Sequence, residues 1–336
     1  MQSVTRASKF SRDPVMYRDE VVSIAPENLT KTDFSIIRIS YEHYATPVHL
    51  AALIGCSVEW MRRRTRTLKR PPNNYLDHAP HQKAEKKKYV WAYQRFSWTP
   101  RGRDELHNVD GFLPRKFPRS SSPAHDVMAD DGILSLKIGE RAHPDIKVID
   151  AHYIVSPLRP FPVAEGKDGW HRFPLVKEKT GSKWNTADPD YFPRGYVRPF
   201  DVEGEHPFIV FEFERGTNSL PRSEYRSSKI GNKLIAWVDV LTHETYWTHM
   251  GLPSLYIALI CYPARVPSLL DQIRLEVPEK FWPFFVVKAM KEEKWDDDHL
   301  PTGWMLETDF TRVKSYRDDV LQTAPFNLLT SALDLT

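Results

Sequence analysis

The hydrophobic pattern is clearest in residues 206–216, HPFIVFEFERG, where most positions are apolar or acidic. Side chains of a β-strand point alternately to the two faces of a sheet. One face of the predicted strand therefore carries Phe208, Val210, Glu212 and Glu214, and the other carries Ile209, Phe211 and Phe213. Because a buried carboxylate is costly unless it is paired or binds a metal, the two glutamates, about 7 Å apart along the strand, mark a candidate site.

The segments around this strand predict a domain with a mixed sheet. Residues 189–200 predict a strand or short hairpin with Asp190 near its start, and residues 254–263 have the continuous apolar character of a strand buried on both faces. Residues 219–247, between the two glutamates and that last strand, are mostly helical, because apolar residues recur there at spacings of three and four. The order strand, strand, helix, strand predicts an α/β (α+β) core.

The N-terminal part predicts three helices. Residues 30–44 carry apolar residues at helical spacing, namely Phe34, Ile37, Ile39 and Tyr41. A second helix is expected to begin at the cap Thr46 with Pro47 in its first turn, and to end at Gly55. Ser57 is a suitable cap for a third, basic helix, in which Val58 and Met61 face inward and four arginines face outward: Arg62, Arg63, Arg64 and Arg66.

A strand and a further helix are expected after the basic helix. Residues Tyr89 to Trp98 predict the strand, and Thr99 followed by Pro100 predicts the start of the helix. A helix, a short turn with glycine and a basic helix form the helix-turn-helix layout, whose second helix enters the major groove of DNA. With a basic hairpin after it, this layout predicts an N-terminal winged helix-turn-helix.

The distribution of charge supports a polyanionic partner. The net charge is only +3, but the segment from Met61 to Arg103 holds thirteen Lys and Arg against two acids, and the rest of the chain is net acidic. Such a segment predicts binding to nucleic acid, here double-stranded DNA, although a solvated charged face gives the same pattern. The candidate DNA-binding residues are Arg62, Arg63, Arg64, Arg66, Lys69, Arg70, Lys86, Lys87 and Lys88.

Several function classes are disfavoured. No apolar run approaches the roughly 18 residues of a membrane span, and the N-terminus carries no apolar signal-peptide segment. The two cysteines, Cys56 and Cys261, are too few for a disulfide scaffold and fit a reducing cytoplasm. Phosphate-binding loops of the Walker or G-x-G-x-x-G type are absent from the sequence. We therefore expect a cytoplasmic protein without a membrane partner.

The acidic pair suggests metal-dependent phosphodiester chemistry. With Asp190 on a neighbouring strand, Glu212 and Glu214 would make a cluster of hard oxygen ligands suited to Mg²⁺ (or Mn²⁺). Lys229 and Lys233, one turn apart on the following helix, would stabilise the negative charge that develops on phosphorus. The alternative is that the glutamates lie on a solvated or edge strand and pair with arginines such as Arg194, Arg198 or Arg222.

The motifs together resemble a known family. The dipeptide Pro189-Asp190, the run EFERGT from Glu212, and a helix with Lys233 and Trp237 four residues apart are similar to the replication-relaxation proteins of plasmids and integrative elements. The TPRG turn from Thr99, and His125 at the opening of the second domain, extend the resemblance, which covers about residues 31–262. That family is similar to the PD-(D/E)xK nucleases, which have the restriction-endonuclease-like fold, and to mobilisation relaxases.

The resemblance implies roles for individual residues. Asp190 would be the first acid, Glu212 the second, and Lys229 or Lys233 a displaced catalytic lysine. Glu214 departs from the pattern in two ways: many such nucleases have lysine at this position, and the family has aspartate. Arg215 either contacts a phosphate or pairs with an acid, after which Gly216 can turn the chain off the strand.

The expected function is a DNA-binding, metal-dependent endonuclease or nickase, relaxase-like, that acts in the replication or conjugative transfer of a plasmid or mobile element, with other replication or transfer proteins as further partners. The alternative is a non-catalytic replication accessory protein or transcription regulator with a degenerate nuclease fold. We expect a flexible arm over residues 1–30, a winged helix over 31–115, a linker over 116–122 and a nuclease-like domain over 123–336.

Overall fold

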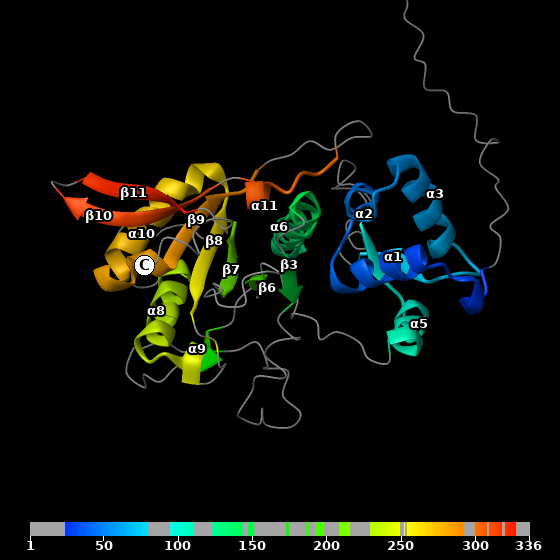
Figure 1. Cartoon of the computed structure of the whole chain (residues 1–336), viewed down its shortest axis with the longest axis horizontal. Helices are drawn as coiled ribbons and strands as arrows, with labels where there is room; N and C mark the ends of the chain where they lie inside the picture. The colour runs from blue at the N-terminus through cyan, green and yellow to red at the C-terminus, as the bar shows by residue number, and fades with distance from the viewer. Residues whose placement is uncertain are drawn as a thin grey trace, which may run out of the picture.

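The protein is a mixed α/β structure (Figure 1). The computed structural model describes a set of residues that runs from 24 to 326 with gaps: 24–79, 95–110, 123–143, 147–150, 173–174, 186–187, 193–197, 208–215, 229–248, 252, 254–291, 300–307, 309–317 and 320–326. The described elements fall into an N-terminal group, from residue 24 to 110, and a C-terminal group, from residue 123 to 326.

The three N-terminal helices are α1 (Lys31–Glu42), α2 (Pro47–Ile54) and α3 (Val58–Lys69). The predicted caps are confirmed, because the Thr46 side chain accepts from His49 N and the Ser57 side chain accepts from Trp60 N. Gly55 ends α2 with φ 81, a left-handed conformation that glycine adopts without steric cost.

A short antiparallel ribbon and a fourth helix follow α3. The ribbon pairs β1 (Leu76–His78) with β2 (Phe96–Trp98), and α5 (Pro100–Asp110) comes directly after it. Thr99 caps α5 as predicted, because its Oγ1 accepts from Gly102 N at 3.1 Å. The expected strand from Tyr89 is described only in its last three residues, since 80–94 lie outside the described residues.

Part of the expected N-terminal arm is packed, which corrects that prediction. Residues 24–30 include a short 3₁₀ turn, η2 (Pro26–Asn28). The backbone N–H and the backbone carbonyl of Ile24 each form a hydrogen bond to a side chain. Ile24 N donates to Asn73 Oδ1 at 2.7 Å, and Ile24 O accepts from Tyr75 Oη at 2.8 Å. The sequence of residues 1–30 has no periodicity, which is why a flexible arm was expected there. The partners of Ile24 are about fifty positions away in the chain, so no local pattern indicates these contacts. Residues 1–23 and the linker 116–122 lie outside the described residues.

The C-terminal group is built on a mixed sheet of order β11-β10-β9-β8-β7 among the described residues. Strands β7 (Ile209–Glu214), β8 (Tyr256–Cys261) and β9 (Phe285–Ala289) are parallel, and β10 (Phe310–Arg317) and β11 (Val320–Phe326) continue it antiparallel. The predicted order strand, strand, helix, strand is present as β6 (Pro193–Val197), β7, α8 (Lys229–Thr242) and β8. Smaller pairs join β3 (Lys147–Asp150) to β6, and β4 (Phe173–Pro174) to β5 (Thr186–Ala187).

Helices cover both faces of the sheet (Figure 1). On one face, α8 and α10 (Val266–Glu276) pack on the side chains of Val210, Ile257 and Leu259. On the other face, α6 (Pro123–Ala142) and α11 (Trp304–Glu307) pack on Phe211, Phe213 and other residues of the alternate positions. The remaining short elements are α9 (Thr245–Thr248), η4 (Pro263–Arg265) and η5 (Glu279–Phe284). The predicted alternation of β7 is therefore confirmed, and Glu212 lies on the face of α8.

Helix α6 joins the two groups. Asp130 on α6 accepts from Tyr44 N at 3.0 Å and lies 3.2 Å from Nδ1 of His43. Lys137 on the same helix donates to Glu42 at 2.9 Å, so that polar contacts recur along the helix. Asp130 is 1% exposed, and such buried polar contacts hold two surfaces in one relative position because separating them would leave charged groups without partners.

None of the described helices is long and apolar enough to cross a membrane.

Candidate functional site

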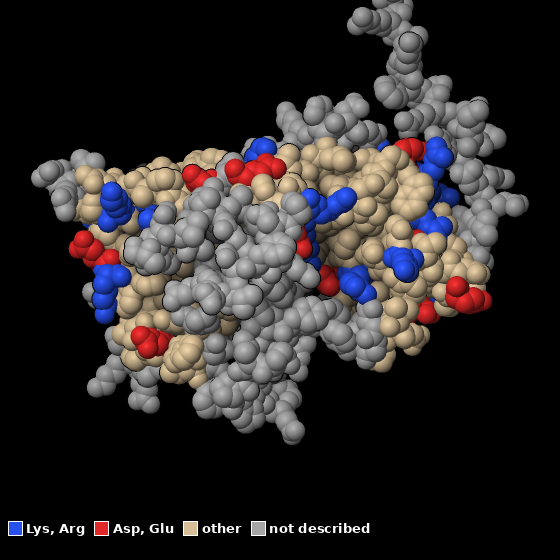
Figure 2. All heavy atoms as spheres, viewed as in Figure 1, with Lys and Arg blue, Asp and Glu red and all other residues tan. Residues whose placement is uncertain are grey.

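Helix α3 separates a buried apolar face from a cationic one. Val58, Met61, Thr65 and Leu68 are its buried residues, and their spacing of three and four gives one stripe toward the core. The basic residues occupy most of the remaining positions, together with Glu59, Trp60 and Thr67. Figure 2 shows Lys and Arg side chains along the edge of the molecule that α3 forms. The sequence prediction of a basic, amphipathic third helix is therefore confirmed for its structure.

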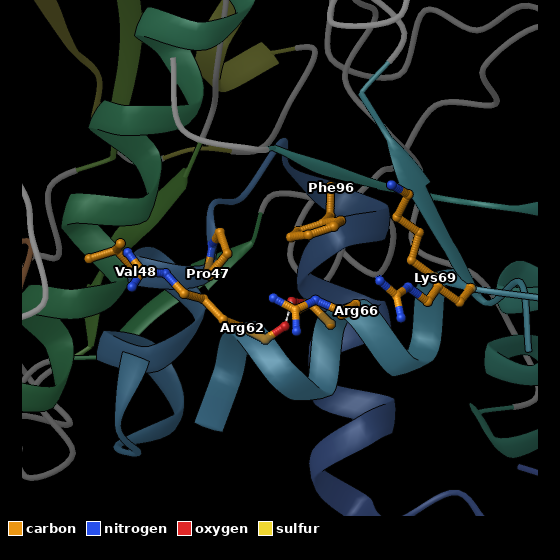
Figure 3. A pocket seen from close by; sticks show the side chains of 8 residues that line it. Pro47, Val48, Arg62, Arg66, Lys69 and Phe96 are labelled. Atoms are coloured by element: carbon orange, nitrogen blue, oxygen red, sulfur yellow. Dashed lines mark hydrogen bonds between the residues drawn. The ribbon is translucent and has the colours of Figure 1, made fainter. Parts of the chain in front are cut away.

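A cavity of about 400 Å³ lies beside α3 (Figure 3). Its walls come from α3, from Arg70 directly after α3, from the start of α2 and from β2. Arg62, Arg66 and Lys69 leave α3 on the side of Pro47 and Phe96 and line the cavity, with Arg62 toward Val48 and Lys69 toward the ribbon. The complete described lining is Pro47, Val48, Arg62, Thr65, Arg66, Lys69, Arg70 and Phe96. Among these described residues none is acidic, so the cavity is cationic on one side and apolar on the other.

The ribbon fixes the position of Lys69. The Lys69 ammonium group donates to Nε2 of His78 on β1. The His78 ring in turn stacks on Phe96 of β2, with ring centroids 6.0 Å apart and an interplanar angle of 14°. The two strands therefore hold both the lysine and the apolar wall of the cavity.

Two arginines of α3 lie elsewhere. Arg63 is on the exposed side of the helix and pairs with Glu59 one turn earlier, Nε to Oε1 at 3.0 Å. Arg64 was expected to face outward with the others, but its guanidinium forms two hydrogen bonds to Asp33 of α1, whose side chain is 0% exposed. Burial alone would raise the pKa of Asp33, but the hydrogen bonds from Arg64 and Thr30 outweigh it and lower that pKa below 3.8. Arg64 therefore holds α3 to α1.

The second candidate cluster is centred on Glu212 of β7. This side chain is 1% exposed, and both of its oxygens accept hydrogen bonds from α8. Lys233 Nζ donates to Oε2, and Trp237 Nε1 donates to Oε1 at 2.9 Å. Because Lys233 and Trp237 are four residues apart on one helix, both reach the same strand position. The carboxylate is therefore paired in the interior, which is the condition for burying its charge.

Trp237 was predicted only as a core residue and as part of the family pattern. Its ring does lie in the core, with Phe173 at a centroid distance of 5.2 Å, and it is 1% exposed. Its role as the second donor to Glu212 was missed. The spacing of four from Lys233 is the signal that could have indicated it, because residues at this spacing share one side of a helix.

The C-terminal end of β7 gathers further polar residues. Glu214 is the last residue of the strand and Arg215 follows it, both partly buried. His125 of α6 donates from Nε2 to the Phe213 carbonyl oxygen at 3.0 Å. Glu214 is opposite Cys261 in the parallel register, and burial, with the nearby Glu214 carboxylate, raises the pKa of the Cys261 thiol to about 12. Cys261 is therefore an inert thiol.

Several predicted site residues are not placed. Asp190 and Lys86, Lys87 and Lys88 lie outside the described residues, and Lys229 is described only as the first residue of α8. Of the predicted catalytic set, Glu212 and Lys233 are brought together. Within the described ranges no group of three or more His, Cys, Asp or Glu could hold a metal ion, and both oxygens of Glu212 already accept hydrogen bonds from protein groups. The described residues therefore do not by themselves fit a Mg²⁺ site.

Comparisons with known proteins gave no family. No family model matches the chain, no curated protein matches it, and no solved structure matches it. Inferences about function therefore depend on the residues and geometry described above.

Proposed function

We propose that the protein binds double-stranded DNA through α3. The observation that carries the proposal is the row of Arg62, Arg66 and Lys69, at spacings of four and three, on one side of an otherwise well-packed helix. Lys and Arg clustered along one side of a helix are the electrostatic footprint of a nucleic-acid-binding surface. The short turn at Gly55 between α2 and α3 gives the helix pair the order of elements of a helix-turn-helix, in which the second helix enters the major groove.

The surroundings of α3 favour a nucleic acid over a small anion as the main partner. The ribbon β1–β2 lies against the same side of α3, through Lys69 and His78, and leads into the segment that contains Lys86, Lys87 and Lys88. A winged helix uses such a ribbon as a second contact to the duplex. An extended partner would contact α3 and the ribbon together, which a small anion would not.

Binding to a fluorescently labelled short duplex, measured by anisotropy, tests this function. Lys69→Ala should weaken binding and lower the dependence of affinity on salt, because the variant neutralises one phosphate fewer. Lys314→Ala removes an exposed lysine of β10 and is the matched control, which should bind as the wild type does. Absence of duplex binding by the wild-type protein would reject the proposal.

A second candidate function is metal-dependent cleavage or nicking of the bound DNA in the replication or transfer of a plasmid or mobile element. The observation that favours it is the contact between Lys233 and Glu212, because an acid on a strand and an amine from the next helix are the pair that the nuclease resemblance predicts. The amine would stabilise negative charge on a phosphate. Mg²⁺ or Mn²⁺ would require Asp190 in addition, with Glu214 nearby.

A nicking assay on supercoiled plasmid, with Mg²⁺ and with Mn²⁺, separates this candidate from a non-catalytic DNA-binding protein. If the pair is catalytic, Glu212→Gln should abolish nicking while duplex binding is retained. Because this variant also breaks the buried pair with Lys233, both assays are run below its lowered melting temperature. Glu279→Gln changes an exposed carboxylate and is the control. If the wild-type protein binds duplex and does not nick it under either metal, the regulator or replication accessory function is correct.

A further inference from the structure

We propose that the cavity between α2, α3 and β2 is a binding site for a phosphate group, carried either by the DNA backbone or by a small phosphorylated molecule. The inference deepens the proposed DNA binding in the first case and goes beyond it in the second. It assigns the residues at positions 62, 66 and 69 to one site.

The shape of the cavity supports a defined ligand. Its volume of about 400 Å³ lies in the lower part of the range of about 300–1,000 Å³ that small-molecule sites occupy. A simple contact between a flat cationic surface and a duplex needs no such hollow. A phosphate with its attached sugar is a group of suitable size and charge for it.

The arrangement of cations supports phosphate as the chemistry. Positions 62, 66 and 69 are separated by four and three residues, so their side chains leave α3 on one side and reach the same space. Arg70 completes the cationic lining. Guanidinium groups form two parallel hydrogen bonds to phosphate oxygens, and the lysine adds a point charge, which together make a strong site for a doubly charged anion.

The opposite wall strengthens these charges. Pro47, Val48 and Phe96 are all buried, so they present apolar atoms to the cavity. Charges attract more strongly beside a low-dielectric wall than in open water. The positive end of the α2 dipole has the same sign as the cations and adds to their effect.

The outer row of α3 provides a contrast. Arg63 lies between Arg62 and Arg64 on α3 and points away from the cavity. Its side chain is 70% exposed, and it forms an ion pair with Glu59. An exposed pair of this kind is solvated and screened by salt. The proposed phosphate site therefore lies on the side of α3 that faces Pro47 and Phe96.

Isothermal titration calorimetry with inorganic pyrophosphate tests the cavity without any DNA. Binding is expected for the wild-type protein, and Arg66→Ala should weaken it about tenfold or more, as the loss of a charged hydrogen bond predicts. Arg66→Lys keeps the charge without the paired hydrogen bonds and should recover part of the affinity. Lys31→Ala, an exposed lysine of α1 that does not line the cavity, is the control and should bind as the wild type does. Circular dichroism melting checks that each variant is folded.

Competition between pyrophosphate and labelled duplex then distinguishes the sources of the phosphate. Displacement of duplex by pyrophosphate, with both weakened by Arg66→Ala, identifies the DNA backbone. A small phosphorylated ligand is identified if pyrophosphate binding depends on Arg66 and duplex binding does not. The same ligand is identified if pyrophosphate binds and duplex does not bind at all. In that second outcome the proposed DNA binding fails, and the cavity site stands. Pyrophosphate affinity that is absent, or equal in Arg66→Ala and the wild type, overturns the inference.

Discussion

Trp237 donates the hydrogen of its indole nitrogen to Oε1 of Glu212 at 2.9 Å, inside the core between α8 and β7. The other oxygen of the same carboxylate accepts from Lys233. The two donors come from one helix and the acceptor from a strand 21 to 25 positions earlier in the chain. The contact fixes how α8 lies on the sheet, whether or not the pair also acts on DNA.

Removing the charge partner of Glu212 should be strongly destabilising. In Lys233→Met the buried carboxylate loses its cation, and a loss of about 3 kcal/mol in the free energy of unfolding is expected. Lys233 is 23% exposed, so water reaches its end of the pair and keeps the loss near the lower end of the usual range. Urea unfolding monitored by tryptophan fluorescence measures it.

The double variant Glu212→Gln with Lys233→Met is the control for this effect. It removes both charges and keeps an oxygen that can accept from Trp237, so it should be more stable than Lys233→Met alone. If the double variant is no more stable than the single one, the loss comes from packing and the ion pair is not its cause.

The pair of Asp33 and Arg64 should make the protein sensitive to acid. The pKa of Asp33 is lower in the folded protein than its value of 3.8 in the unfolded chain. The pair therefore stabilises the fold above pH 3.8, and this contribution is lost as the pH falls below 3.8 toward the folded pKa. Asp33→Asn should be less stable than the wild type at neutral pH, and the difference should shrink at acid pH. A difference that does not change with pH would contradict the assignment.

Lys288 should make stability depend on pH on the alkaline side, in the same direction as Asp33 does in acid. Burial lowers the pKa of this lysine from 10.5 to about 7, with Asp309 and Glu307 opposing the shift. Between these two pH values the unfolded chain binds a proton that the folded protein does not, so stability should rise as the pH is raised. Lys288→Met should remove that rise, as measured by urea unfolding across the interval. Lys280→Met, an exposed lysine of η5, is the control and should retain it.

Gly132 should not tolerate a methyl group. A Cβ at this position of α6 would lie 2.4 Å from Cε1 of Phe213 on β7. Replacing glycine by alanine inside a helix normally stabilises it by about 0.5–1 kcal/mol, but here the overlap should destabilise by about 1–3 kcal/mol. Thermal melting shows whether Gly132→Ala raises or lowers the stability of the protein. Adding Phe213→Leu should recover part of the loss if the ring is the obstacle, and a stabilising Gly132→Ala would contradict the close approach of α6 to the sheet.

Much of the secondary structure could be predicted because its signals are local. Thr46 and Ser57 cap helices through the backbone N–H three residues later, and Gly55 ends α2 through its own conformation. The alternation in β7 is likewise contained in one short run. Each of these features depends on residues within a few positions of one another, which is why a sequence pattern is sufficient to find them.

The missed features depend on residues far apart in the chain. Arg64 and Asp33 are 31 positions apart. The helical spacing places Arg64 on the opposite border of the apolar stripe from Arg62 and Arg66, but nothing within α3 indicates that Asp33 lies there. The residues after 262 had no assigned role, yet they provide β9, β10 and β11 of the sheet. Their place depends on pairing with β8, which is decided by packing of the whole sheet and not by local preference. The predicted acid Asp190 lies outside the described residues, so the metal and nuclease predictions remain proposals.

The central claim, that α3 binds duplex DNA through the cationic side that lines the cavity, is tested most directly by the salt dependence of duplex affinity. The measurement compares the wild-type protein with the triple variant Arg62→Ala, Arg66→Ala and Lys69→Ala, from about 50 mM to about 200 mM salt. The account predicts a steep fall in wild-type affinity with salt, and for the variant a slope smaller by about 0.9 for each phosphate that is no longer neutralised. Equal affinities and equal slopes for the two proteins would contradict it.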